Sequence, residues 1–299
     1  MFEGGDGRLI EKRTWLKCRG FVFLLLAVLL LDGNGLGQTS ATAKAELGSE
    51  TAKNGFKNED EIRDKFTNWK ADADARAWLV VMGYRLENIE SVIASKPHGE
   101  KADVELRIRF FPQSRKDAKA LTERREGISI KLVSSTNGFN QIDKRWLATY
   151  AKKWRMPIMV SNALQFFVGE KPPLRPGRDE KRMYLDELDD ASPKLIVDFF
   201  TANRDEIVSD LFAGDGEHAS GWFMVAYKAT TKTRWVLVTD KKAAEFFGAG
   251  KVELTARGNL KIGRITMQRK GGDGGRDTAK MLQFKVNPAL LLTSAKASQ

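Results

Sequence analysis

The fold prediction rests first on Ala102–Phe111, with the sequence ADVELRIRFF, and Ile128–Val133, with the sequence ISIKLV. Apolar and polar residues alternate in both, which is typical of β-strands with one buried face. Because side chains repeat their direction every second residue, Ser129 and Lys131 share one face of the second strand. If the strands pair, Asp103 meets them from the first. The sequence therefore predicts a carboxylate and an amine on adjacent strands.

This pair of groups suits metal-assisted hydrolysis of a phosphodiester. Asp103 would hold Mg2+ against the scissile phosphate, and Lys131 would orient the attacking water and offset charge on the phosphate. PD-(D/E)xK nucleases share this arrangement, but Ala102 stands where proline is usual and Ser129 where Asp or Glu is usual. As a bare pattern it is weak, and an Asp–Lys ion pair across two strands is the alternative.

The rest of the chain alternates between helical and strand patterns. Helical spacing of apolar residues predicts helices over Asn54–Trp69, Asp143–Arg155 and Ser192–Phe212. The aromatic stripe of the second helix, Trp146, Tyr150 and Trp154, is expected in the core rather than stacked on bases. Further strands are expected over the following stretches: Trp222–Tyr227, Thr233–Val238, Lys261–Gln268 and Met281–Val286. The order predicts an α/β or α+β fold in one body.

The amino-acid composition excludes some kinds of metal site and favours an anionic partner. The chain has 299 residues, one cysteine and two histidines, which excludes an internal disulfide framework and zinc sites of the four-cysteine or two-cysteine, two-histidine kind. A bound metal is therefore expected to be a hard cation such as Mg2+ held by carboxylates. The formal charge of +11 favours an anionic partner, either nucleic acid or an acidic membrane surface.

Residues 1–44 differ from the rest of the chain in their sequence pattern. Basic residues precede the apolar run Phe21–Leu31, whose eleven residues are too few to cross a bilayer. The segment is read either as a signal peptide or as an over-long start. We expect it to be an extension preceding a domain over residues 45–299. A secreted basic protein remains an alternative on this segment alone.

Three long stretches resemble one known family: Lys131–Tyr150, Gly48–Ile62 and Gly263–Lys285. Their sequences are similar to those of type II restriction endonucleases that cut at GCGC, the HinP-one-I family within the PD-(D/E)xK superfamily. The resemblance implies an α/β fold with a restriction-endonuclease-like mixed sheet flanked by helices. It also implies Mg2+-dependent double-strand cleavage of DNA, as a monomer or a homodimer. A family start near Leu47 implies a cytoplasmic enzyme with no membrane association.

Carried over to this sequence, the resemblance implies Asp103 as metal ligand and Lys131 as catalytic lysine. Ser129 stands where the family has Gln, and a short neutral hydroxyl is a poor ligand, although the backbone carbonyl of Ile130 could coordinate. Glu59 matches a family glutamate on the first helix and is a further candidate metal ligand. Glu105 shares a face with Asp103, but a solvated or paired acid is the simpler expectation.

Two segments are expected to contact double-stranded DNA. Asn140 and Gln141 follow a turn beside the catalytic strand, and the resemblance supports contacts by Gln141 and Lys144. The second segment is a glycine-rich basic loop whose donors and acceptors suit G and C base edges. Its candidate residues are Arg269, Lys270, Asp273 and Arg276. A solvated hairpin is the alternative for this loop, and a catalytically inactive DNA-binding relative is the alternative for the whole chain.

Overall fold

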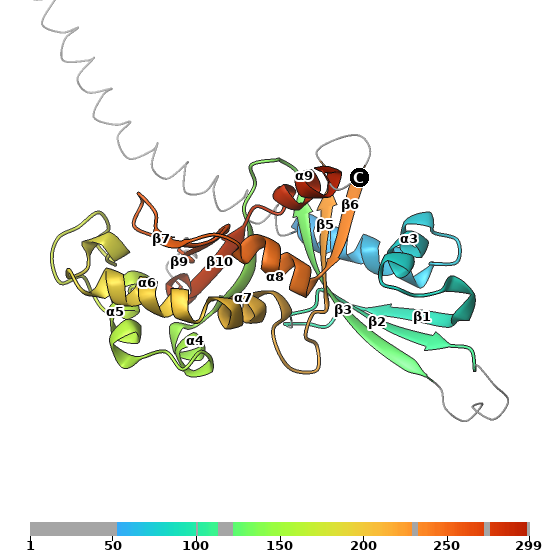
Figure 1. Cartoon of the computed structure of the whole chain (residues 1–299), viewed down its shortest axis with the longest axis horizontal. Coiled ribbons are helices and arrows are strands. Elements are labelled where there is room, and N and C mark those ends of the chain that lie inside the picture. The colour runs from blue at the N-terminus through green and yellow to red at the C-terminus, as the bar shows by residue number, and fades with distance from the viewer. Residues whose placement is uncertain (1–52, 100, 113–121, 229–232, 272–275, 298–299) are drawn as a thin grey trace, which may run out of the picture. The chain divides into compact units, whose positions relative to one another are not determined.

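A five-stranded mixed sheet contains both stretches that the sequence singled out (Figure 1). Its strands, in spatial order, are β1 (Ile89–Ser95), β2 (Val104–Phe110), β3 (Glu123–Val133), β5 (Trp222–Tyr227) and β6 (Arg234–Thr239). β3 and β5 are parallel, and the other neighbours are antiparallel. A parallel pair requires a long crossover, and residues 134–221 supply it. The computed structural model describes residues 53–99, 101–112, 122–228, 233–271 and 276–297.

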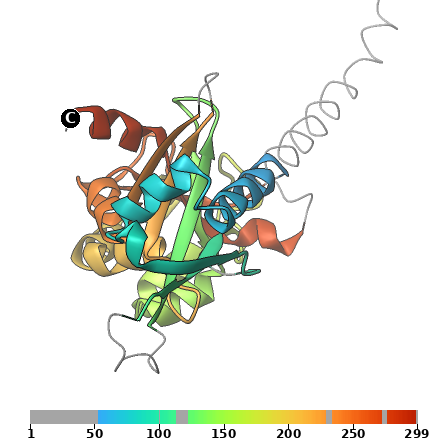
Figure 2. The same cartoon turned by 90° about the vertical axis from the view of Figure 1, so that its right-hand side faces the viewer.

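Helices cover one face of this first sheet (Figure 2). Residues 53–67 form a helix, and α3 (Ala73–Val81) follows after Asp72, whose carboxylate accepts a hydrogen bond from the backbone N–H of Ala75 at 2.9 Å. Such N-terminal caps stabilise a helix by satisfying a free backbone donor. The two helices bury Phe66, Trp78 and their neighbours against the apolar face of β2 and β3. The expected first helix is confirmed.

An antiparallel second sheet lies within the same unit, which spans Asn54–Gln299. Its strands, in spatial order, are β4 (Asn140–Arg145), β10 (Leu282–Val286), β9 (Ile265–Arg269), β8 (Leu260–Ile262) and β7 (Val252–Leu254). The remaining helices are α4 (Leu147–Lys153), α5 (Ile158–Val168), α6 (Ser192–Ala202), α7 (Arg204–Ala213), α8 (Asp240–Gly248) and α9 (Ala289–Ala297). Of these, α8 and α9 pack against β5 and β6 of the first sheet. Short 3-10 helices lie at Leu86–Asn88, Leu185–Glu187 and Asp277–Lys280. The predicted α/β architecture, a mixed sheet flanked by helices, is confirmed.

Several predicted boundaries were wrong. Asp143–Arg155 is not one helix, because Asp143 to Arg145 pair with β10 and the helix begins only at Leu147. Tyr150 and Trp154 are buried as expected, whereas Trp146 is 39% exposed. Ser192–Phe212 divides into α6 and α7 at Asn203.

A glycine divides the strand predicted over Lys261–Gln268. Gly263 has a φ of 56°, and a Cβ there would lie 2.6 Å from the backbone of Gly248. Only glycine tolerates both the positive φ and this close approach. The chain therefore turns here, and β8 and β9 pair as a hairpin.

The predicted extension over residues 1–44 lies outside the described residues. Within the part of the chain that is described, no helix combines the length and apolar character needed to cross a bilayer.

Asp240 is one of several buried carboxyl groups among the described residues. Asp240 begins α8 and is only 5% exposed. Burial raises the pKa of Asp240 to about 7, and nearby Ser220, Lys101 and Lys131 offset only part of this effect. The folded protein therefore holds this proton more tightly than the unfolded chain does.

We expect Asp240→Asn to stabilise the protein more at pH 8 than at pH 5. Because the folded-state pKa is raised, stability falls as pH rises from about 4 to about 7, and above that the full cost of a buried charge is present. Asparagine has no charge to bury. Thermal unfolding at both pH values measures the difference, with the exposed Asp198→Asn as control. Equal shifts at both pH values would contradict this titration.

Candidate active site

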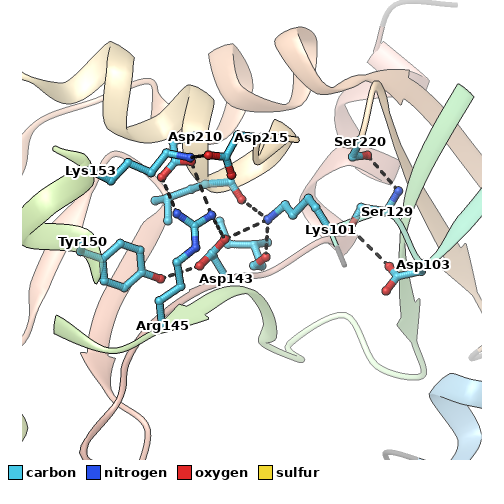
Figure 3. A network of polar contacts seen from close by, with 12 residues as sticks. Lys101, Asp103, Ser129, Asp143, Arg145, Tyr150, Lys153, Asp210, Asp215 and Ser220 are labelled. Atoms are coloured by element: carbon cyan, nitrogen blue, oxygen red, sulfur yellow. Dashed lines mark hydrogen bonds and ion pairs between the residues drawn. The ribbon is translucent and has the colours of Figure 1, made fainter. Parts of the chain in front are cut away.

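Asp103, Ser129 and Lys131 meet where β2 and β3 begin to pair (Figure 3 labels the first two). A single oxygen of Asp103, Oδ2, accepts hydrogen bonds from the backbone N–H of Ile130 at 2.6 Å and from the Ser129 hydroxyl at 3.3 Å. The Lys131 ammonium lies 3.6 Å from the same oxygen. The structure therefore brings together the acid and the amine that the alternating pattern placed on one face.

The end of β2 produces this arrangement. Its ladder with β3 ends at Val104, which pairs with Ile128, while β3 continues to Val133. The N–H and C=O of one strand residue point toward the same neighbour. Ile130 therefore directs both groups to the side where β2 has ended. The Asp103 carboxylate accepts the hydrogen bond from the Ile130 N–H. The Ile130 carbonyl points to the same side of β3 as this carboxylate.

Ser129 supplies no charge to the site. It is 3% exposed, and its backbone N–H donates to the Ser220 hydroxyl at 3.1 Å. Ser220 in turn donates to the carbonyl of Trp222 at 2.8 Å. Among the described residues no cluster of three or more acidic, His or Cys side chains could hold a metal.

Glu59 lies close enough to Asp103 to respond to its charge. Burial raises the pKa of Glu59, a hydrogen bond from Lys96 lowers it, and the Asp103 carboxylate raises it again. Lys96 Nζ lies 3.1 Å from Glu59 Oε2. Glu105, in contrast, is 4% exposed and is paired with His218 Nδ1 at 2.7 Å. It is therefore the paired acid that we expected.

These donors fit one hard divalent cation. Among the described residues Oδ1 of Asp103 makes no hydrogen bond or ion pair, and the Ile130 carbonyl adds a neutral oxygen. Carboxylate and carbonyl oxygens are the ligands that Mg2+ prefers, with water and phosphate oxygens completing its six positions. The Ser129 hydroxyl is oriented toward Asp103 and could hold a metal-bound water.

A cavity of about 370 Å3 opens beside these groups. It is bounded on one side by Asp103, Ser129 and Lys131 and on the other by the edge strand β4. Both Gln141 and Lys144 line it, so two predicted DNA-contacting residues share a cleft with the predicted catalytic residues. Lys101 also lines it, and sequence reasoning missed this residue.

Lys101, which lies just before β2, links this strand to β4 through hydrogen bonds (Figure 3). Its ammonium donates to the carbonyl of Ile142 at 2.7 Å and to the carbonyl of Leu211, and it lies 3.3 Å from Asp143. Burial lowers the pKa of Lys101, and the Asp143 carboxylate opposes this shift. No local sequence pattern indicated this role, because the carbonyls that Lys101 binds lie 41 and 110 positions away along the chain.

Two buried carboxylates complete the attachment. Arg145 lies 2.9 Å from both Asp143 and Asp210, so it joins β4 to α7. The Tyr150 hydroxyl donates to Asp143 at 2.5 Å, and the Trp154 indole donates to Asp210 at 2.8 Å. Buried charges are tolerated when they are paired and hydrogen-bonded in this way. The position of β4 beside the cleft is therefore tightly determined.

The remaining predicted DNA contacts lie elsewhere. Asn140 donates from its amide to the carbonyl of Leu132 at 2.9 Å and so ties β4 to β3. Arg269 donates to the carbonyl of Ala279 at 3.1 Å, and burial and nearby Arg182 lower the pKa of Arg269. Lys270 and Arg276 flank residues 272–275, and Asp273 lies outside the described residues. Direct contacts by this loop stay a prediction.

Comparisons with known proteins agree with this geometry. The family model of the R.HinP1I restriction endonuclease matches residues 82–292. The crystal structure of the restriction endonuclease MspI in complex with its cognate DNA has a similar fold, with a TM-score of 0.52 and 14% sequence identity. The similarity covers 76% of this chain and 87% of that chain. A comparison with curated proteins found no significant match. The family model covers most of the chain and includes every element of the cleft, so this protein belongs to the R.HinP1I restriction endonuclease family.

Proposed function

We propose that the protein is a type II restriction endonuclease that cleaves both strands of DNA at GCGC and requires Mg2+. Membership of the family makes it a site-specific DNA-cleaving enzyme. The observation that supports the chemistry is the convergence of Ile130, Ser129 and Lys131 on one oxygen of Asp103. The GCGC site is supported by the resemblance of the three long stretches.

The side chains divide the work of hydrolysis. Asp103 and the Ile130 carbonyl would hold Mg2+, with Glu59 close by. When bound, Mg2+ supplies a Lewis acid for the scissile phosphate and lowers the pKa of a bound water. Lys131 places a positive charge beside the phosphate, where it stabilises the additional negative charge of the transition state. The Lys101 ammonium binds the carbonyls of Ile142 and Leu211 and lies beside Asp143. Lys131 is therefore the lysine whose ammonium lies beside Asp103.

Recognition would begin at the edge of the same cleft. Gln141 and Lys144 are exposed on β4 and line the same cavity as Asp103 and Lys131. The amide of Gln141 and the ammonium of Lys144 could therefore bind DNA beside the proposed catalytic groups. Placing base contacts and catalysis on neighbouring strands couples correct binding to cleavage. A palindromic four-base site suits either a two-fold dimer or a monomer that nicks each strand in turn.

We expect Asp103→Asn and Lys131→Met to abolish cleavage while retaining DNA binding. Asp103→Asn removes the carboxylate ligand, and Lys131→Met removes the ammonium but keeps the aliphatic chain. By analogy with the loss of a transition-state stabilising donor, each should reduce the rate by at least about 100-fold. Digestion of a sequenced plasmid in Mg2+, with fragment ends mapped, measures activity, and a gel shift measures binding.

Lys194→Met is the matched control, because Lys194 is exposed and its partner among the described residues is Asp198 on the same helix, α6. Full activity is expected for it. Fragment ends that do not map to GCGC would refute the proposed specificity, and cutting in EDTA would refute the metal requirement.

A second function is favoured by one observation. Ser129 is buried and neutral, so the site lacks the second acid typical of these nucleases. An inactive, sequence-specific DNA-binding relative would shift GCGC duplexes without cutting them. In that case Ser129→Gln or Ser129→Glu is expected to restore cleavage. If wild-type protein is inactive and neither variant cuts, the missing ligand is not the reason.

A further inference from the structure

The second sheet presents a polar face that continues the cleft. In β10, Leu282, Phe284 and Val286 are fully buried in the core, so Lys285 points to the opposite face. Residues directly opposite each other on antiparallel strands share a face. The register gives one such row across the whole sheet: Gln141, Lys285, Thr266, Lys261 and Glu253. The row begins at Gln141, which lines the cleft.

Lys285 is the unusual member of this row. It is half-buried, and burial alone lowers the pKa of its ammonium group. Among the described residues it makes no hydrogen bond and no ion pair. Lys261, three strands away from β4 in the same row, is exposed and lies 3.6 Å from Glu253. Among the described residues, Lys261 is thus paired with a carboxylate, whereas Lys285 is not.

The neighbours of Lys285 indicate what it binds. Gln141 lies directly opposite on β4, and Lys144 lies on the same strand, paired with Gln283. The register positions beside Lys285 therefore hold Gln141 and Thr266, and neither is a carboxylate. A half-buried ammonium without a counter-charge is costly unless an anion occupies the site. The bases of DNA are neutral, so the matching anion is a backbone phosphate.

We propose that Lys285 is a further DNA-binding residue, which contacts a backbone phosphate of duplex DNA as the duplex extends from the catalytic cleft across the polar face of the second sheet. This inference rests on the proposed function, since it takes DNA as the substrate in the cleft. Lys285 positions the duplex through its phosphate and carries no sequence information.

The test compares Lys285→Met with Lys194→Met, which removes an exposed lysine of α6. Fluorescence anisotropy in EDTA measures binding to two labelled duplexes, one containing GCGC and one lacking it, at KCl concentrations from 50 to 200 mM, which are on the order of those used to resolve salt dependence. Lys285→Met is expected to weaken binding to both duplexes by roughly tenfold, as for one hydrogen bond to a charged group. The slope of log Kd against log salt should fall by about one. Lys194→Met, a change on α6 outside this face, should bind like wild type, and Lys285→Arg should retain the slope.

Three results would overturn the proposal. The first is wild-type affinity and slope in Lys285→Met. The second is a loss confined to the GCGC duplex, which would indicate a base contact instead. The third is an equal loss in Lys285→Arg and Lys285→Met, which would indicate packing rather than charge. The proposed function is scored separately by wild-type cleavage, so absence of cutting with an intact Lys285 effect would refute that function and leave this contact standing.

Discussion

The site depends on one hydrogen bond, from the backbone N–H of Ile130 to the carboxylate of Asp103. It exists because β2 stops pairing while β3 continues, which leaves a strand residue with an unpaired donor. The carboxylate that caps this donor is thereby held against the strand that carries Lys131. Its position follows from backbone geometry and not from a flexible side-chain contact. The backbone of Ile130 thus orients Asp103 although position 129 carries a neutral serine.

A network of buried charges holds the two sheets together at the cleft. Lys101, from just before β2, reaches the edge of β4, while Asp143 and Arg145 reach back to α4 and α7. Removing one member of a buried charge pair typically costs about 3–5 kcal/mol, because the other charge is left without a partner. The network therefore resists partial rearrangement. It keeps Gln141 and Lys144 at a fixed position relative to the catalytic strands.

The two faces of the second sheet have different roles. The core face packs against α4 and α5, whereas the other carries Lys285, Thr266, Lys261 and Glu253 in register with Gln141. An antiparallel sheet can keep one face polar in this way because its side chains alternate between the two faces. The edge strand β4 thus borders both the cleft beside Asp103 and this polar face.

Local pattern was sufficient for some features of this protein. The alternation in Ala102–Phe111 and Ile128–Val133 predicted both strands and the shared face of Asp103, Ser129 and Lys131, because side-chain direction in a strand depends only on position along the chain. The pattern of Asp143–Arg155 predicts a helix throughout, and this is wrong for Asp143 to Arg145, because their partners in β10 are 137 to 141 positions away and leave no local signal. Lys101, Asp210 and Lys285 acquire their roles only through partners, or the lack of partners, brought near by folding. Local pattern was thus enough to propose a reacting acid and amine, whereas the pairing and burial of the charges could be seen only in the fold, because both depend on distances between residues far apart in the chain.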